Sequence, residues 1–246
     1  MLSFKTKTQS LHGGIQLGKR VLSNSMFFGL GPSLTEEQKE LVQALLDPEV
    51  NVVVIPSVAG TGKTTLVTGA AKIMKKDLVY VFPNVSEDEF GYLPGPLWEK
   101  YYQYLGPLFD ALDEIGEEPD KVVFNEDACK DPALYSKQMN ALKNGQIWVY
   151  PKPHGFLRGR NLKGDRVIFI DEAQNFSKGQ LKKILTRCHD SCKVVLAGHM
   201  GQCDLDHVAQ SGFPDYIEFY KTAPYAKVIE LNKCFRGKVA ADADRV

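Results

Sequence analysis

Short runs of β-branched and apolar residues recur along the chain, each bounded by polar or glycine-containing turns. The runs cover residues 51–56, 77–82, 166–170, 193–197 and 227–231. Apolar runs of this length are typical of strands that are buried on both faces, as in a parallel sheet. The pattern therefore predicts a mostly parallel sheet.

Segments with apolar residues at helical spacing lie between these runs. The predicted helices cover residues 34–46, 66–74, 98–114 and 178–187. Ser33 or Thr35 can cap the first of them, whose first turn is acidic. Since helices alternate with strands, we expect an α/β fold with helices on both faces of the sheet.

The chain is long enough for one large α/β domain. Residues 1–33 are polar and weakly periodic, which predicts an N-terminal arm that is partly flexible or forms a hairpin packed on a neighbour. Residues 34–246 are predicted to form the domain itself. Within it, the stretch from about 84 to 163 is less regular, and we interpret it as an inserted segment.

The residues after the first apolar run have the pattern of a phosphate-binding P-loop. They are Ser57, Val58, Ala59, Gly60, Thr61, Gly62, Lys63, Thr64 and Thr65, between a predicted strand and a predicted helix. Gly60 and Gly62 allow backbone N–H groups to point at phosphate oxygens. Lys63 would reach the β- and γ-phosphates, and the Thr64 hydroxyl would coordinate Mg²⁺. The motif predicts a nucleoside triphosphate site.

A second motif follows the apolar run at 166–170. Asp171 and Glu172 are adjacent carboxylates at the C-terminal end of a predicted strand, where such a sheet binds its ligands. Asp171 can hold Mg²⁺ through water, and Glu172 can orient and deprotonate an attacking water. An Asp-Glu pair alone is a weak signal, but together with the P-loop it indicates hydrolysis of the γ-phosphate.

Five further polar residues are candidates for roles at this site or beside it. Gln38 precedes the P-loop and could hydrogen-bond adenine, as in helicase-like ATPases. Gln202 follows a strand and could sense the γ-phosphate, while Arg236 could stabilise transition-state charge. Arg158 and Arg160 flank a glycine. They could contact nucleic-acid phosphate, the phosphate of a nucleotide in a neighbouring subunit, or surface carboxylates.

Composition limits the classes of partner. Thirty basic residues balance thirty acidic ones among 246, so nucleic-acid contact would have to come from a local patch. The apolar runs are far shorter than the ~20 residues of a membrane span, and the N-terminus lacks a signal-peptide core. Five scattered cysteines favour a reducing compartment, so we expect a cytoplasmic protein.

Taken together, these motifs resemble the PhoH family. The resemblance is carried by Leu34, Thr35 and Gln38, by residues 59–64, by residues 91–95 with Glu99 and Lys100, and by residues 157–162 and 171–175; it continues through residues 185–187, Gly198, Gln202, Asp204, Ser211 and Gly212. It implies an ATPase core similar to the first RecA-like domain of superfamily 1 helicases. ATP, Mg²⁺ and single-stranded RNA or DNA are the implied ligands.

Three positions depart from the family pattern. Ser57 replaces the opening glycine of the P-loop, which a negative φ would permit. Phe82 replaces an arginine before Pro83, which weakens any phosphate contact expected there. His199 replaces an aspartate, leaving the sensor role to Gln202.

A superfamily 1 helicase needs two RecA-like domains, whereas this chain has room for one. We therefore expect a homo-oligomer, with a hexameric ring favoured, in which Arg158, Arg160 or Arg236 reaches a neighbour's site. No fused nuclease domain is expected. The compact length is similar to that of bacteriophage members, which would place the protein in the host cytoplasm. The alternatives are a nucleotide-dependent switch that binds nucleic acid without unwinding it, and a small-molecule kinase.

Overall fold

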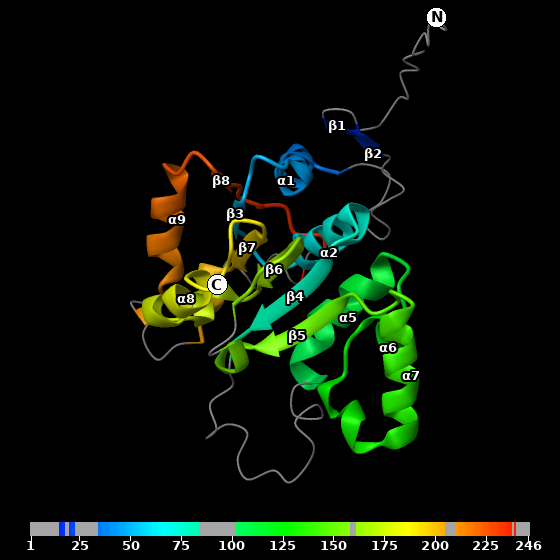
Figure 1. Cartoon of the computed structure of the whole chain (residues 1–246). Coiled ribbons are helices and arrows are strands. Elements are labelled where there is room, and N and C mark those ends of the chain that lie inside the picture. Colours follow the sequence, from blue (N-terminus) through cyan, green and yellow to red (C-terminus); the bar gives the residue numbers. More distant parts are fainter. Residues whose placement is uncertain are drawn as a thin grey trace, which may run out of the picture.

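The computed structural model describes residues 15–17, 20–22, 34–83, 102–157, 161–204, 210–237 and 239. Most of the predicted arm, the start of the predicted insertion, and both Arg158 and Arg160 lie outside the described residues. Inside the arm, β1 (Ile15–Leu17) and β2 (Arg20–Leu22) form an antiparallel pair. β1 lies against the first helix of the domain (Figure 1).

A six-stranded sheet forms the centre of the molecule, in the order β5-β4-β6-β7-β3-β8 (Figure 1). Its strands are β3 (Val52–Pro56), β4 (Asp77–Phe82), β5 (Val149–Pro153), β6 (Arg166–Ile170), β7 (Lys193–Gly198) and β8 (Ala226–Val228). Every pairing in this sheet is parallel. The prediction of an α/β fold with a mostly parallel sheet is thus confirmed.

The strand at each end of the sheet differs from the sequence pattern. β5, within the predicted insertion, was not predicted at all, since Pro151 and Pro153 argue against a strand. An end strand tolerates them because one of its edges needs few ladder hydrogen bonds. β8 is shorter than the run at 227–231, although Leu231 still forms an isolated bridge with Ser57.

Helices cover both faces of the sheet. The longer ones are α1 (Glu36–Leu46), α2 (Lys63–Met74), α5 (Gly106–Glu114), α7 (Pro132–Lys143), α8 (Lys178–Leu185) and α9 (Phe213–Lys221), with α6 (Pro119–Val122) as a single turn. Short 3₁₀ helices are η2 (Gln103–Leu105), η3 (Glu126–Lys130), η4 (His154–Leu157), η5 (Ala173–Asn175) and η6 (Met200–Gln202). In the described part of the predicted helix 98–114, residue 102 is α-helical, η2 follows it, and α5 begins at Gly106.

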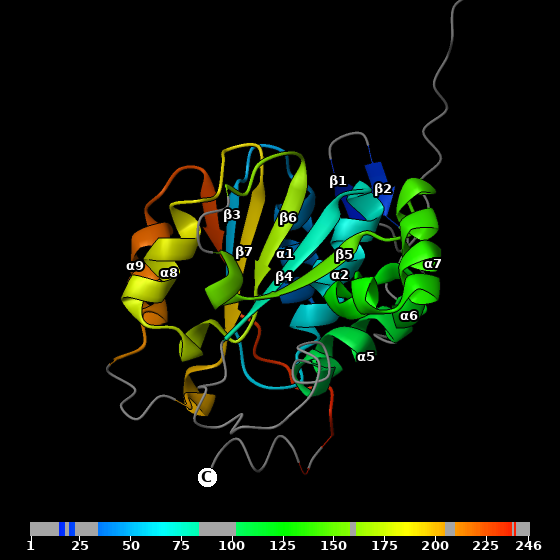
Figure 2. The same ribbon diagram turned by 60° about the horizontal axis from the view of Figure 1, so that its bottom comes forward.

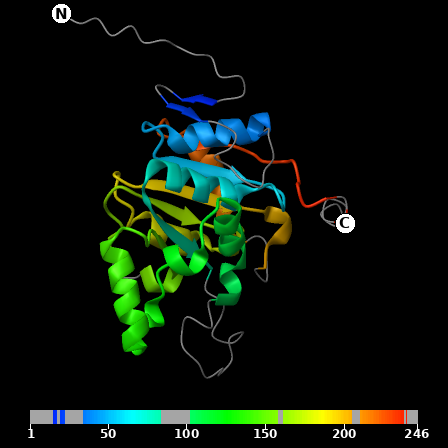
Figure 3. The same cartoon turned by 90° about the vertical axis from the view of Figure 1, so that its right-hand side faces the viewer.

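The alternation of side chains along each strand divides the core into two layers. Val53 and Ile55 join the layer under α1, α2 and α5, whereas Val52 and Val54 join the layer under α8 and α9. Figure 3 shows α1 in blue and α2 in cyan on the same side of the sheet. Figure 2 shows α8 and α9 at one end and α5, α6 and α7 at the other. Among the described residues, no helix is long and apolar enough to cross a bilayer.

A buried lysine joins the sheet to the C-terminal end of α1. Lys193, the first residue of β7, is 5 % exposed. Its Nζ donates to the carbonyl oxygens of Ala44 at 3.1 Å and Asp47 at 2.7 Å. Burial lowers the pKa of Lys193 to about 8, the charge of Lys76 lowers it further, and Asp47 opposes the shift.

Substituting Lys193→Met should remove a rise in stability at alkaline pH. Between about pH 8 and the ordinary value of 10.5, the unfolded chain holds more protons than the folded one at this residue. The free energy of unfolding therefore rises with pH in that window, by about 1–2 kcal/mol after allowance for solvent screening. Urea unfolding at pH 7.5 and pH 10 should show the wild type gaining on Lys193→Met. Lys227→Met, at an exposed lysine, is the control, and parallel changes in all three proteins would contradict the prediction.

Candidate nucleotide-binding site

The P-loop turn connects β3 to the N-terminus of α2. Gly60 has φ 69° and Gly62, the N-cap of α2, has φ 78°. Both lie in the left-handed region that favours glycine, and the turn directs backbone N–H groups of the helix N-terminus outward. Among the described residues other than glycine, positive φ occurs at Lys75 and Glu172 but not at Ser57. Serine at the opening position is therefore compatible with the turn.

Asp171 is the buried anchor of the site and follows β6 directly. Its Oδ2 accepts hydrogen bonds from Thr64 Oγ1 at 3.1 Å and from the Tyr80 hydroxyl at 3.0 Å. Its Oδ1 accepts from the N–H of Glu172 at 3.0 Å. Burial raises the pKa of Asp171, although the positive charge of Lys63 opposes the shift. The environment thus holds this carboxylate in one orientation at a cost in desolvation.

Lys63 lies between the two carboxylates. Its Nζ is 3.3 Å from Glu172 Oε1 and 3.8 Å from Asp171 Oδ1. Burial by itself lowers the pKa of Lys63, but the charges of Asp171 and Glu172 outweigh that effect and raise it above the ordinary value. An ammonium group in this position remains charged at neutral pH.

The donor set fits a magnesium ion. Thr64 Oγ1 and Asp171 Oδ2 are 3.1 Å apart, so one cation could contact both. Both donors are oxygens, which Mg²⁺ prefers.

Glu172 is held in an unusual backbone conformation, with φ 52° and ψ 43°. Such a conformation costs about 1–3 kcal/mol outside glycine and persists only where the surroundings impose it. Its Oε2 accepts a hydrogen bond from Gln174 Nε2 at 2.6 Å. The side chain remains 36 % exposed, so a water molecule can reach the carboxylate.

Gln174 connects Glu172 to the turn that follows β7. The buried amide donates from Nε2 to the carbonyl of Gln202 at 3.1 Å, and its Oε1 accepts from the N–H of His199 at 2.9 Å. A Cβ at Gly198 would lie 2.7 Å from Gln174 Oε1, so only glycine leaves room there. Gln202 itself is exposed and reaches this network through its carbonyl oxygen.

Substituting Gln174→Ala should lower kcat about 10- to 100-fold with little change in KM, as is usual when a partner that orients a functional group is lost. Steady-state ATP hydrolysis over a range of ATP concentrations measures both constants. Gln146→Ala, at an exposed glutamine, is the matched control. An unchanged kcat, or a loss that appears in KM alone, would contradict the orienting role.

Gln38 is bound to the P-loop itself. Its Oε1 accepts from the N–H of Thr35 at 3.0 Å, completing a capping box, and its Nε2 donates to the carbonyl of Thr61 at 3.1 Å. The residue is 1 % exposed. Both ends of the amide thus brace α1 against the P-loop, and the predicted contact with adenine stays a prediction.

The segment after β8 brings Arg236 to the P-loop of its own chain. The N–H of Phe235 donates to the carbonyl of Gly60 at 2.8 Å. A Cβ at Gly60 would lie 2.7 Å from Arg236 Cγ, and the charge of Arg236 acts to lower the pKa of Lys63. Of the two predicted positions for Arg236, this placement favours its own site over that of a neighbour.

The sequence alone did not assign roles to Tyr80, Gln174 or Glu114. Glu114, at the end of α5, accepts a 2.6 Å hydrogen bond from Thr65 Oγ1. Two of the three carry a signal that could have identified them. Gln174 belongs to the motif that begins at Asp171, and Tyr80 places a polar hydroxyl within a buried strand. No sequence signal marks Glu114. A separate cavity of about 500 Å³ lies away from the P-loop, at the amino ends of β3 and β7.

A family model described as PhoH-like protein matches residues 32–244. "Protein PhoH2" of Bacillus subtilis is 29 % identical over 236 residues, which cover 92 % of this chain and 50 % of that protein. A "PhoH-like protein" of Mycobacterium bovis is 35 % identical over 204 residues, covering 80 % and 51 %. One from Synechocystis is 33 % identical over 213 residues, covering 84 % and 58 %. The chain thus spans about half the length of these curated relatives.

Among solved structures, Pif1 of a Bacteroides species, in complex with ADP-AlF4, matches 84 % of this chain and 43 % of its own. The sequence identity is 17 % and the TM-score is 0.39.

Proposed function

This chain belongs to the PhoH-like protein family, and from that premise we propose that it is a Mg²⁺-dependent ATPase coupled to single-stranded RNA or DNA. The observation that carries the proposal is the meeting of two sequence motifs at one point. Lys63 and Thr64 of the P-loop contact Glu172 and Asp171 at the end of β6. Phosphate binding, metal binding and activation of water require these four groups together.

The residues divide the chemistry as follows. Lys63 and Arg236 neutralise phosphate charge, while Thr64 and Asp171 would hold Mg²⁺, which would supply further positive charge for the phosphates. Glu172 accepts a proton from the water that attacks the γ-phosphorus, and the bond to the β,γ-bridging oxygen breaks. ADP and inorganic phosphate are the products. Lys63 exchanges its carboxylate partner for phosphate oxygens when the nucleotide binds.

The proposed coupling to nucleic acid and the proposed assembly are supported by the family resemblance. Members resemble one half of a two-domain helicase, so we propose that a ring of subunits, six in the favoured form, completes the working unit. Arg158 and Arg160 are the candidates for contacts to nucleic acid or to a neighbour's nucleotide. A cytoplasmic location fits such a protein. The relatives reported above are bacterial and give no support to a bacteriophage origin.

Steady-state ATP hydrolysis with and without single-stranded RNA or DNA, on protein sized by light scattering, tests the proposal. We expect turnover that EDTA abolishes and nucleic acid stimulates, from an oligomer. Nucleotide binding without turnover would instead support the switch. A phosphorylated small molecule formed in place of free phosphate would support the kinase.

A further inference from the structure

A small basic cavity lies between η4 and α8, outside the nucleotide site. Its volume is about 110 Å³, and it is lined by His154, Leu157, Gln180, Lys183, Ile184 and Arg187. None of these six residues is acidic. Ligand pockets for whole small molecules occupy about 300–1,000 Å³. This cavity is therefore too small for a nucleotide and suits a single anionic group such as one phosphate.

The positive charge of this region comes from α8 and the turn after it. Residues 178–187 contain four basic side chains and no acidic one. Lys178 is paired with Asp215 at 2.7 Å, whereas Lys182 and Lys183 are exposed to solvent. Arg187 donates from Nη1 to the carbonyl of Leu157 at 2.7 Å and from Nε to that of Lys183 at 2.7 Å. These bonds hold η4 against α8 and use two of the five guanidinium N–H donors.

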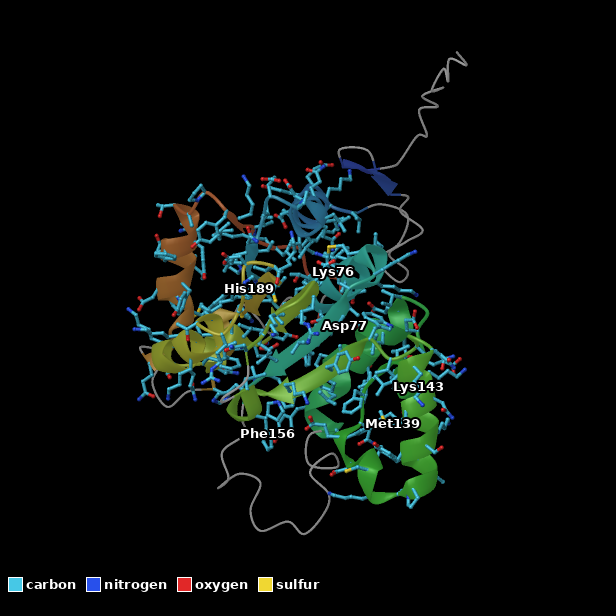
Figure 4. The ribbon with its side chains drawn as sticks, viewed as in Figure 1. Lys76, Asp77, Met139, Lys143, Phe156 and His189 are labelled. Atoms are coloured by element: carbon cyan, nitrogen blue, oxygen red, sulfur yellow. The ribbon has the colours of Figure 1, made fainter. Side chains whose placement is uncertain are left out.

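An exposed aromatic ring belongs to the same short helix. Phe156 in η4 is 48 % exposed, and Figure 4 shows it at the end of the molecule where β5 and η4 meet. Phe156 does not line the cavity itself, but its neighbour Leu157 does, and the carbonyl of Leu157 accepts the hydrogen bond from Arg187. Proteins hold single strands with an aromatic ring near cationic groups, because a base stacks on the ring while its phosphate contacts the cations. An acidic peptide would use the cations but would have no planar base for the ring.

We propose that the surface formed by Phe156, Lys183 and Arg187 binds single-stranded nucleic acid, with Phe156 stacking on one base and the two cations contacting an adjacent phosphate in the cavity. The inference rests on the proposed coupling of this ATPase to nucleic acid. It deepens that proposal because it names the residues and the chemistry of the contact.

The test uses variants of the 246-residue chain and labelled oligo(dT) and oligo(U) 20-mers, with Kd measured by fluorescence anisotropy at several salt concentrations. Phe156→Ala should raise Kd about 5- to 100-fold, the range for loss of one stacked base. Lys183→Gln should raise Kd and reduce the slope of log K against log salt by about 0.7, as expected for one phosphate contact to a single strand. Arg187 is left intact because it holds η4 in place.

The matched controls are Lys143→Gln on α7 (Figure 4) and Phe219→Ala on α9, at a ring that is 57 % exposed. Both should leave Kd unchanged. All four variants should retain the ATPase rate measured without nucleic acid. Wild-type binding that neither Phe156→Ala nor Lys183→Gln weakens would overturn this surface while leaving the proposed function standing. A wild type that binds no oligonucleotide would refute both. Lys183-dependent binding of inorganic phosphate alone would reduce the site to an anion pocket and overturn the proposal.

Discussion

Glu172→Gln should bind ATP with nearly wild-type affinity and hydrolyse it about 10²–10⁴ times more slowly, the usual contribution of a positioned general base. The amide has almost the same shape as the carboxylate but cannot accept the proton of the attacking water. The phosphate-binding groups, the P-loop turn and Lys63, are unchanged. Single-turnover hydrolysis and binding of a fluorescent ATP analogue, measured on the same protein, separate the two effects.

Glu49→Gln, at an exposed glutamate, is the control for this substitution and should match the wild type. Thermal unfolding should show that Glu172→Gln remains folded, because residue 172 keeps its backbone conformation in either form. Turnover within threefold of the wild type would show that Glu172 is not the base. A large loss of ATP affinity would instead assign it to nucleotide binding.

Asp171→Asn should strongly reduce Mg²⁺-dependent turnover without weakening the fold. The loss of one anionic oxygen at the metal should reduce kcat by at least about 100-fold. The free energy of unfolding should rise, because ionising this fully buried carboxylate is costly in the folded wild type. Asparagine keeps the shape and can still hydrogen-bond Thr64 and Tyr80.

The pH dependence of stability tests whether the cost of ionising Asp171 explains the expected stability of Asp171→Asn. The pKa of Asp171 is raised by burial above its ordinary 3.8, so between that value and the folded-state pKa the folded chain holds more protons than the unfolded one. Wild-type stability therefore falls as pH rises through this window, and Asp171→Asn lacks the fall. Urea unfolding from pH 4 to 7.5 should show the variant gaining on the wild type. A variant that is less stable by about 2 kcal/mol at every pH would show that hydrogen bonds to the charged form dominate.

The parts of the molecule encoded by contiguous residues could be predicted from the sequence. β4 and β6 have the predicted boundaries because an uninterrupted apolar run is buried on both faces of a parallel sheet. The P-loop is equally local, since Gly60 and Gly62 mark its turn and Lys63 its function. β5 was missed because its prolines and Lys152 are unfavourable in strands. Its extended conformation depends on pairing with β4, a contact between distant segments.

Contacts between distant segments could not be predicted in the same way. Tyr80 and Asp171 are far apart in the sequence, and only the adjacency of β4 and β6 brings them to a 3.0 Å hydrogen bond. Gln38 was identified by its position before the P-loop, yet its bond to Thr61 depends on how α1 packs. Arg236 was a candidate for its own site or for a neighbour's, and its position beside Gly60 depends on the path of the chain after β8; its role stays a prediction.

The hydrogen bond between Thr65 and Glu114 makes the inserted segment and the nucleotide site dependent on each other. Thr65 follows the proposed metal ligand Thr64 directly in α2, while Glu114 ends α5. Lys72, farther along α2, also pairs at 2.7 Å with Glu117, which lies three residues beyond the end of α5. α2 is therefore joined both to α5 and to the turn that follows it. Suppose that a ligand binds the inserted segment with an affinity that depends on these bonds. If the nucleotide changes the affinity for that ligand by some factor, the ligand must change the affinity for the nucleotide by the same factor. Thermodynamic reciprocity of this kind requires no movement of the sheet.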